Sequence, residues 1–283
     1  MSRLTIPKTY KLYIGGKFPR SESGRVYEVA TAGGTFLANA ARASRKDARD
    51  AVVAARAAEP GWAGATGYNR GQVLYRVAEV LEGRRAQFVD EISATEGVTI
   101  AVAGAQVDAA IDSWVWFAGW ADKYVQVAGN GNGVSGPYFN LSTPEPTGVV
   151  AIVAPRSSLL GLASVIGSAV CTGNTVVVLA SEAAPLSAIS LAEVLATSDV
   201  PGGVVNILTG SVAEVAPWLA SHADVNGLDL AGAEELDWID LQVAAAETLK
   251  RVLPPVGGDP ARSIGRMLAF TETKTVWHTK SMI

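Results

Sequence analysis

The sequence predicts an α/β protein built on a doubly wound parallel sheet, with helices that precede the sheet in the chain. Two observations predict this fold class. Short apolar runs without polar alternation recur between about residues 148 and 252, and segments of helical character separate them. Such runs are typical of strands covered on both faces, and strand–helix repetition is typical of a parallel sheet. The hydrophobic fraction of 49% supplies a sizeable core and excludes global disorder.

The first sixty residues carry a strand signal and a helix start. Residues 11–14 precede a glycine pair and predict a strand and a turn. Ser44 has the character of an N-cap, and Asp47, three residues later, completes a shortened capping box. An alanine-rich helix is expected to continue to Ala58, and Pro60 is expected to end it.

Three more helices are expected before the sheet. Residues 69–92 show the apolar spacing of a helix, and Gly83 divides them into two. Residues 102–127 predict a third helix. Aromatic side chains lie on more than one of its faces, which favours a buried core helix over an aromatic ligand cage. These side chains are Trp114, Trp116, Phe117 and Trp120.

The second half of the chain supplies the strands. After a glycine-rich loop at residues 129–133, residues 138–143 alternate in polarity and predict a strand. The buried strands of the sheet and the helices between them follow in turn. Strands are expected at about 149–154, 176–179, 204–208 and 227–230, and helices at about 185–196 and 212–220, with an earlier one ending near 170.

Charge and cysteine content exclude several classes of function. A net charge of −4 and a pI of 5.3 argue against nucleic acid as a partner. One cysteine allows no internal disulfide, and with two histidines it leaves too few ligands for a Cys/His zinc site, so we expect no metal. The apolar stretch 159–178 is interrupted by glycines, and no targeting segment is visible. We therefore expect no membrane span and a cytoplasmic location.

Isolated motifs favour structural roles. The G-x-G-x-x-G pattern that begins at Gly131 has no strand before it and no helix after it, so it predicts a loop more than a dinucleotide site. Cys171 ends an apolar helix and favours a buried small hydrophobe over a nucleophile. His222 and His278 favour surface or capping roles. Five carboxylates fall close together and indicate a solvated face. They are Asp229, Glu234, Glu235, Asp237 and Asp240.

Three longer runs, residues 144–155, 172–178 and 201–210, resemble the aldehyde dehydrogenase superfamily, and residues 10–16 and 70–82 are similar to it as well. The resemblance implies an NAD(P)-type Rossmann-like domain with a small β oligomerisation arm. It divides the chain into a nucleotide-domain unit and a linker with a C-terminal oligomerisation strand. The first unit covers residues 1–252 and includes arm strands at about 134–147, and the second covers residues 253–283.

The residues that the resemblance would make catalytic are replaced. Arg156, Ser157 and Ser158 stand where the family has a tryptophan–asparagine pair, whose amide helps bind the oxyanion. Pro255 aligns with the general-base glutamate. Only 25 residues follow Gly258 and none is cysteine, yet residues 268–276 resemble the family's C-terminal strand. The chain therefore looks internally deleted, like the cysteine-less second half of certain two-part aldehyde dehydrogenases, and we assign no catalytic residue.

At the positions that bind the cofactor in the family, some residues are retained in this chain and others are replaced. Leu179 aligns with the family lysine that contacts the cofactor ribose, whereas the glutamate three residues later is retained as Glu182. Gly210 and Gly232 still permit a close backbone approach. The Thr-Gly-Ser segment at the pyrophosphate has lost both hydroxyls, because residues 231–233 are Ala-Gly-Ala. The resemblance thus implies NAD or NADP binding at Glu182, Gly210 and Gly232 that is weakened or lost.

Aldehyde oxidation by this family needs a thiolate, an oxyanion donor and a base, and none of the three has a candidate here. The resemblance predicts a catalytically deficient protein that is a structural or regulatory subunit of an active aldehyde dehydrogenase. Its partner would be a full-length homologue or a second copy of itself. The alternative is an NAD(P)-dependent oxidoreductase that acts on aldehydes with a partner's catalytic domain. A third possibility is that the chain is an inactive remnant with no selected role.

Overall fold

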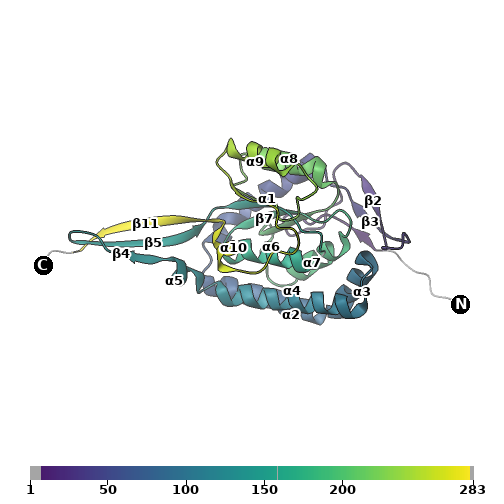
Figure 1. The fold of residues 1–283 in the computed structure, drawn as a ribbon, viewed down its shortest axis with the longest axis horizontal. Coiled ribbons are helices and arrows are strands. Elements are labelled where there is room, and N and C mark those ends of the chain that lie inside the picture. Colours follow the sequence, from purple (N-terminus) through teal and green to yellow (C-terminus); the bar gives the residue numbers. More distant parts are fainter. Residues whose placement is uncertain (1–7, 158, 281–283) are drawn as a thin grey trace.

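A sheet of five parallel strands lies between two layers of helices in the computed structural model, which describes residues 8–157 and 159–280 (Figure 1). From β6 the chain adds two strands on one side, and it then crosses back to add two on the other. The order is β10-β9-β6-β7-β8, which confirms the doubly wound parallel sheet. The strands are β6 (Val149–Val153), β7 (Thr175–Leu179), β8 (Val205–Leu208), β9 (Gly227–Asp229) and β10 (Arg251–Leu253).

Both faces of this sheet are covered, as the uninterrupted apolar runs predict. Val150 and Ile152 point into one hydrophobic core, and Ala151 and Val153 point into the other. The first core contains side chains of α2 (Gly67–Gly83), α3 (Arg85–Glu96), α4 (Ile100–Trp120), α6 (Leu160–Cys171) and α7 (Leu186–Ala196). The second contains side chains of α1 (Arg45–Ala63), α8 (Val212–Ser221) and α9 (Trp238–Ala246).

A second, three-stranded sheet precedes α1, and the sequence reasoning missed most of it. The segment predicted to be a strand at residues 11–14 forms isolated bridges instead. Tyr13 exchanges two backbone hydrogen bonds with Ile207, of 2.9 and 2.8 Å, and this contact ties the segment to β8. The small sheet has the order β1-β3-β2. Its strands are β1 (Thr9–Tyr10), β2 (Val26–Ala30) and β3 (Phe36–Ala41).

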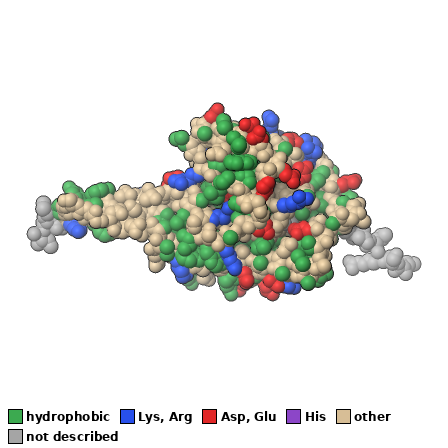
Figure 2. Space-filling model, viewed as in Figure 1, with side chains coloured by type: hydrophobic (Ala, Val, Ile, Leu, Met, Phe, Trp, Pro, Cys, Tyr) green, Lys and Arg blue, Asp and Glu red, His purple; other side chains and the backbone are tan. Residues whose placement is uncertain are grey.

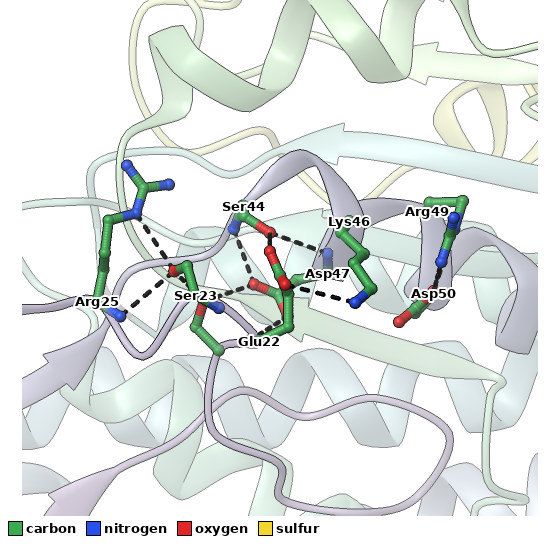
Figure 3. Close-up of polar contacts among 9 residues, drawn as sticks. Glu22, Ser23, Arg25, Ser44, Lys46, Asp47, Arg49 and Asp50 are labelled. Carbon is green, nitrogen blue, oxygen red and sulfur yellow. Dashed lines mark hydrogen bonds and ion pairs between the residues drawn. The ribbon is translucent and has the colours of Figure 1, made fainter.

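The predicted capping box at the start of α1 is confirmed (Figure 3). The backbone N–H of Ser44 donates to Oδ2 of Asp47 at 2.8 Å, and the N–H of Asp47 donates back to Oγ of Ser44 at 3.3 Å. Two residues of the loop before β2 join this cap. The hydroxyl of Ser21 donates to Asp47 at 2.7 Å, and Ser44 donates to the carboxylate of Glu22 at 2.9 Å.

The expected end of α1 at Pro60 is wrong, because the helix continues through Pro60 to Ala63. A proline in a last turn removes one backbone hydrogen bond, and here tertiary contacts outweigh that loss. Trp62 is only 3% exposed, and its indole N–H donates to the carbonyl of Val170 at 2.9 Å. The burial of Trp62 therefore explains why the last turn forms.

Of the two predictions for the helices before the arm, one is confirmed and one is wrong. The division at Gly83 is confirmed, since α2 ends there and α3 begins at Arg85. The single helix expected over 102–127 is instead α4 followed by the short α5 (Tyr124–Ala128). Trp114 and Phe117 are fully buried, in agreement with a core helix.

An arm of three antiparallel strands projects from one end of the body (Figure 1). The loop expected at 129–133 contains one of these strands, so that prediction is wrong. The middle strand ends at residue 146, three residues beyond the predicted end at residue 143. It tolerates its two prolines because they lie where the strand pairs with one neighbour only. The other neighbour pairs with residues 140–142 alone. The arm has the order β11-β5-β4, with β4 (Asn130–Asn132), β5 (Tyr138–Pro146) and β11 (Thr271–Thr279).

A buried ion pair joins the sheet to the segment that leads into the arm. Asp229, at the end of β9, is 0% exposed, and it pairs with Arg266 of α10 (Ile264–Leu268). The expectation that all five clustered carboxylates form a solvated face is therefore wrong for Asp229. The other four carboxylates are exposed. The predicted domain division after residue 252 falls inside β10.

Candidate functional site

A cleft of about 780 Å³ opens at the carboxyl ends of the parallel strands. Every strand of the sheet contributes to it through the segment that follows the strand, as expected for an open α/β sheet. The lining residues are Ala154, Arg156 and Ser157 after β6, Ser181–Ala183 after β7, Val212 and Ala213 after β8, Gly232 and Glu234–Leu236 after β9, and Gly257–Asp259 after β10.

Gly232 lines the cleft, and close backbone packing requires a glycine at this position. A Cβ atom at this position would fall on the carbonyl oxygen of Ala154. The three N–H groups of the turn at residues 231–233 are all used inside the protein. They donate to the carboxylate of Asp229 and to the carbonyls of Val153 and Leu230, over 2.9–3.1 Å. This turn therefore offers no free N–H to an anion.

Glu182 lies at the rim of the cleft, where the loop after β7 carries it into solvent. A carboxylate in this position accepts hydrogen bonds from ligand hydroxyl groups. Leu179, at the position of the family lysine, takes no part in the cleft. Its side chain is 4% exposed and packs in the core between the sheet, α1 and α8.

Acidic side chains outnumber basic ones around the cleft. Arg156 is the one basic residue among the lining residues that the structure describes, and its guanidinium lies 3.7 Å from Glu235. Both side chains are more than 85% exposed, so this pair contributes little stability. Glu182, Glu234 and Asp259 complete the charged lining.

The sequence reasoning did not assign Asp259 to the cleft. Burial of its carboxyl group raises the pKa of Asp259, and a hydrogen bond from Ser157 opposes this effect. The signal was present in the preceding glycines. Gly257 and Gly258 both adopt positive φ angles, of 67° and 136°, and they turn the chain after β10 back toward the start of α6.

Gly210, the third predicted cofactor residue, is not among the residues that line the cleft. It has a φ of 119°, and a Cβ atom there would lie 3.0 Å from backbone atoms of Arg42 and Ala43. In this structure Gly210 allows the turn before α8 to pass close to the segment that leads into α1. The structure thus brings Glu182 and Gly232 together at one cleft and leaves Gly210 outside it.

Cys171 is buried in the body and lacks the properties of a reactive thiol. It is 0% exposed, its thiol lies 3.2 Å from the carbonyl oxygen of Phe117, and burial raises its pKa to about 12. At neutral pH the thiolate is therefore almost absent, which agrees with the structural reading of the sequence. His222 ends α8 and accepts a hydrogen bond from the N–H of Asp224 at 3.1 Å. His278 lies on β11.

The described residues offer neither a metal-ligand cluster nor a membrane-spanning helix. Over residues 8–157 and 159–280, no group of three or more His, Cys, Asp or Glu side chains is placed to hold a metal ion. In the same part of the chain, no helix has the length and apolar character needed to cross a membrane. Gly131 lies in β4, so the G-x-G-x-x-G pattern belongs to the arm and not to the cleft.

A parallel α/β sheet with helices on both faces and a cleft at its carboxyl edge defines a Rossmann-like α/β protein, and comparison with known proteins gives its family. The profile of the aldehyde dehydrogenase family matches residues 18–264. The chain belongs to the aldehyde dehydrogenase family.

Relatives of known sequence or structure extend this result. The chain is 32% identical over 266 residues to cytosolic 10-formyltetrahydrofolate dehydrogenase of Mus musculus, an alignment that covers 91% of this chain and 29% of the relative. It is 34% identical over 257 residues to retinal dehydrogenase 2 of Gallus gallus, with coverage of 89% and 49%. The NAD+ complex of an aldehyde dehydrogenase from Bacillus cereus superposes with a TM-score of 0.82 at 27% identity, over 87% of this chain and 50% of that one. The chain thus spans about half the length of these relatives, or less.

Proposed function

We propose that this chain is a catalytically deficient member of the aldehyde dehydrogenase family, and that it serves as a structural or regulatory subunit of an active aldehyde dehydrogenase. The observation that carries the proposal is the state of its one cysteine. Covalent catalysis by this family needs an accessible thiolate, whereas Cys171 is fully buried and its pKa is raised to about 12.

We further propose that the cleft binds NAD or NADP weakly or not at all. The lining carries four carboxylates and one guanidinium, and the N–H groups of the turn at Gly232 are already hydrogen-bonded. A pyrophosphate needs donors and positive charge, so this part of a dinucleotide fits poorly. A ribose fits better, since the carboxylate of Glu182 is open to its hydroxyl groups.

The arm is the surface on which we place the partner. Its exposed side chains include Phe139, Leu141 and Trp277, which are 36–58% exposed. The ring of Trp277 packs edge-on against Tyr138, with centroids 5.9 Å apart, so these aromatic groups are held in place before any partner arrives. Preorganised aromatic anchors are typical of the centres of protein interfaces. The partner is a full-length aldehyde dehydrogenase or a second copy of this chain.

The test is binding to a purified full-length aldehyde dehydrogenase from the same organism, followed by its activity with and without this chain. We expect a stable complex and no aldehyde oxidation by this chain alone. The double variant Phe139→Ala/Trp277→Ala should weaken the complex at least tenfold, because two anchors are lost. The matched control is Tyr68→Ala/Tyr75→Ala, which removes two exposed aromatic side chains from α2. Turnover of acetaldehyde by the chain alone would contradict the proposal.

The second candidate is an NAD(P)-dependent oxidoreductase that uses a partner's catalytic domain. Two features favour it. Glu182 remains at the rim of the cleft, and α8 begins there with Val212 and Ala213, so a helix N-terminus faces the cleft. Calorimetric titration with NAD and with NADP separates the two functions. A micromolar Kd would support the second candidate, and no heat at millimolar cofactor would support the first. A cytoplasmic location belongs to both and stays a prediction.

A further inference from the structure

A serine hydroxyl and a carboxylate lie together in the cleft, and neither has a role in the function proposed above. Ser157 follows β6 and Asp259 follows β10, and both residues line the cleft. A hydrogen bond joins the hydroxyl of Ser157 to the carboxylate of Asp259. A hydroxyl group that donates to a carboxylate has the arrangement of a nucleophile with a general base beside it.

The carboxylate of Asp259 is held in position from two sides. A Cβ atom at Gly161, in the first turn of α6, would collide with Oδ1 of Asp259 and with the ring of Pro155. The carboxylate therefore rests against the backbone of α6, where a glycine leaves room for it. In the loop before Asp259, the N–H of Gly257 donates to Oε1 of Glu234 at 3.1 Å. The base is thus in place before a substrate arrives.

The start of α6 favours negative charge on the oxygen of Ser157. The N–H of Gly161 donates to Oγ of Ser157 at 3.3 Å. The N-cap residue of this twelve-residue helix is Leu159, whose side chain cannot accept a hydrogen bond. The positive end of the helix dipole therefore faces the serine oxygen without a side-chain cap. Such an end stabilises the charge that develops on the attacking oxygen and on the oxyanion that follows.

Both groups can be reached from the cleft. Ser157 is half-buried and Asp259 is exposed as a residue. Burial of its carboxyl group raises the pKa of Asp259, the hydrogen bond from Ser157 opposes this rise, and Glu96 at the end of α3 adds to it. A carboxylate with a raised pKa accepts a proton from a hydroxyl group more readily than an ordinary one does.

The charge of the cleft restricts the substrate. Its lining carries four carboxylates and one guanidinium over the residues that the structure describes. Figure 2 shows acidic side chains over the body of the molecule and hardly any on the arm. An acidic cleft repels anionic substrates and attracts cationic ones. The volume of about 780 Å³ is ample for a small organic molecule.

We propose that Ser157 and Asp259 hydrolyse neutral and cationic acyl esters and thioesters in this cleft. Oγ of Ser157 attacks the acyl carbon while its proton passes to the carboxylate of Asp259. Asp259 then gives this proton to the leaving alcohol or thiol as the bond between that group and the acyl carbon breaks, and an acyl-serine remains.

Water completes the reaction. A water molecule attacks the acyl-serine and gives a proton to Asp259, which returns it to Oγ of Ser157 as the carboxylic acid leaves. The sum is ester and water to acid and alcohol, so the reaction needs neither an oxidant nor a cofactor. It goes beyond the proposed role as a subunit, and either one can hold without the other.

The first test is covalent labelling of the intact chain with a fluorophosphonate, which reacts with activated serine hydroxyls, followed by peptide mass spectrometry. We expect label on Ser157, and labelling at least tenfold slower in Asp259→Asn. Asp112→Asn, on the exposed side of α4, is the matched control. A wild-type chain without label on Ser157 would overturn the proposal, and that result does not depend on the folding of any variant. Equally fast labelling of Asp259→Asn would overturn it too.

The second test is turnover of three thioesters, measured by the thiol that is released. They are acetylthiocholine, its analogue with a tert-butyl group in place of the ammonium group, and an analogue with a carboxylate at that place. We expect the anionic compound to react at least tenfold more slowly than the other two, and Ser157→Ala to lose at least a hundredfold in rate.

The control for this loss is Ser221→Ala, at the exposed end of α8. Circular dichroism establishes that each variant is folded. Turnover that survives Ser157→Ala, or that is fastest with the anionic compound, would overturn the proposal. Aldehyde oxidation plays no part in these assays, so their failure leaves the proposed role as a subunit standing.

The third test is the pH dependence of kcat/KM for the uncharged tert-butyl thioester, whose binding does not depend on the charge of the cleft. The rate should fall as the pH falls through the pKa of Asp259, which lies above its ordinary value of 3.8, because a protonated carboxyl group cannot accept the serine proton. The residual activity of Asp259→Asn should lack this fall, and a wild-type rate without it would overturn the proposal. The other charged groups around Asp259 are Glu96, Arg156, Glu182, Glu234 and Glu235.

Discussion

Two strand pairs, one in the body and one in the arm, depend on different contacts. In β6 and β7 all ten residues are buried, between a layer of helices on each side. In β5 and β11, which pair over nine residues each, most side chains are exposed. The first pair is held by burial of apolar area, and the second mainly by its backbone ladder. The body therefore buries its sheet within the chain, whereas the arm leaves most of its side chains open to solvent.

The largest effect is expected at the joint between these regions, the buried pair of Asp229 and Arg266. Arg266→Met leaves a fully buried carboxylate without its partner, and this should cost about 3–5 kcal/mol of the free energy of unfolding at pH 7. Urea unfolding measures it. Burial already raises the pKa of Asp229, although Arg266 opposes the rise, so the cost should shrink as acidification protonates the carboxyl group.

A double variant sharpens this prediction. Asp229→Leu combined with Arg266→Met removes both charges and should recover most of the lost stability, because a well-packed apolar pair replaces a buried ion pair at little cost. If the double variant were as unstable as Arg266→Met alone, the loss would come from packing around α10 and not from the uncompensated charge.

Inside the body, Ile152→Ala should destabilise by about 2–5 kcal/mol, because it removes three methyl or methylene groups from a side chain that is 1% exposed. The measurement is again the midpoint and slope of urea unfolding. A loss below about 1 kcal/mol would mean that β6 is less tightly packed than the burial of its side chains in the two cores indicates.

A smaller effect is expected from Glu193 of α7, which pairs with Lys8 at 2.8 Å and with Arg84 at 2.6 Å. Burial acts to raise the pKa of Glu193, but its hydrogen bonds from Lys8 and Arg84 outweigh burial and lower it. The two ion pairs of Glu193 thus stabilise the fold at pH values above the unfolded-state pKa, which is near 4.5. This stability is lost as the pH falls through the lower folded-state pKa.

Glu193→Gln should therefore cost up to about 1 kcal/mol at pH 7, and progressively less below about pH 4.5, since the side chains are partly exposed and screened. Unfolding curves at a series of pH values measure the difference from the wild-type chain. A cost that does not change with pH would show that the hydrogen bonds, and not the charge, carry the effect. Glu247→Gln, on the exposed end of α9, serves as the control.

The smallest effect on stability is expected on the arm. Trp277→Ala should change the free energy of unfolding by no more than about 0.5 kcal/mol, because the side chain is 58% exposed. The same variant should weaken binding to a partner. A loss of stability as large as that of Ile152→Ala would remove the contrast between the two regions, since it would make the arm part of the cooperative body.

Local signals in the sequence predicted much of the body. The apolar runs of β6 and β7, the helix division at Gly83 and the capping box at Ser44 all depend on residues close together in the chain. The errors arose where distant segments decide. Pro60 lies inside α1 because Trp62 packs against α6, and β4 forms because β5 lies beside it.

The candidate site was predictable in part for the same reason. The resemblance pointed to Glu182 and Gly232, which line one cleft, and to Gly210, which packs elsewhere. It did not point to Asp259 as a lining residue, because the two glycines before it indicate a turn but do not say where in the fold that turn takes the chain. The burial of Asp229 was also missed, since its partner Arg266 is 37 residues away.

By itself, the sequence determined the fold class, the family resemblance and the presence of a single cysteine, because these follow from apolar patterning and from residue identity along the chain. Tertiary structure alone decided which carboxylates are buried and which line the cleft, and that the N–H groups at Gly232 are already used. Burial and hydrogen-bond partnership belong to pairs of distant segments, so no local pattern of residues records them.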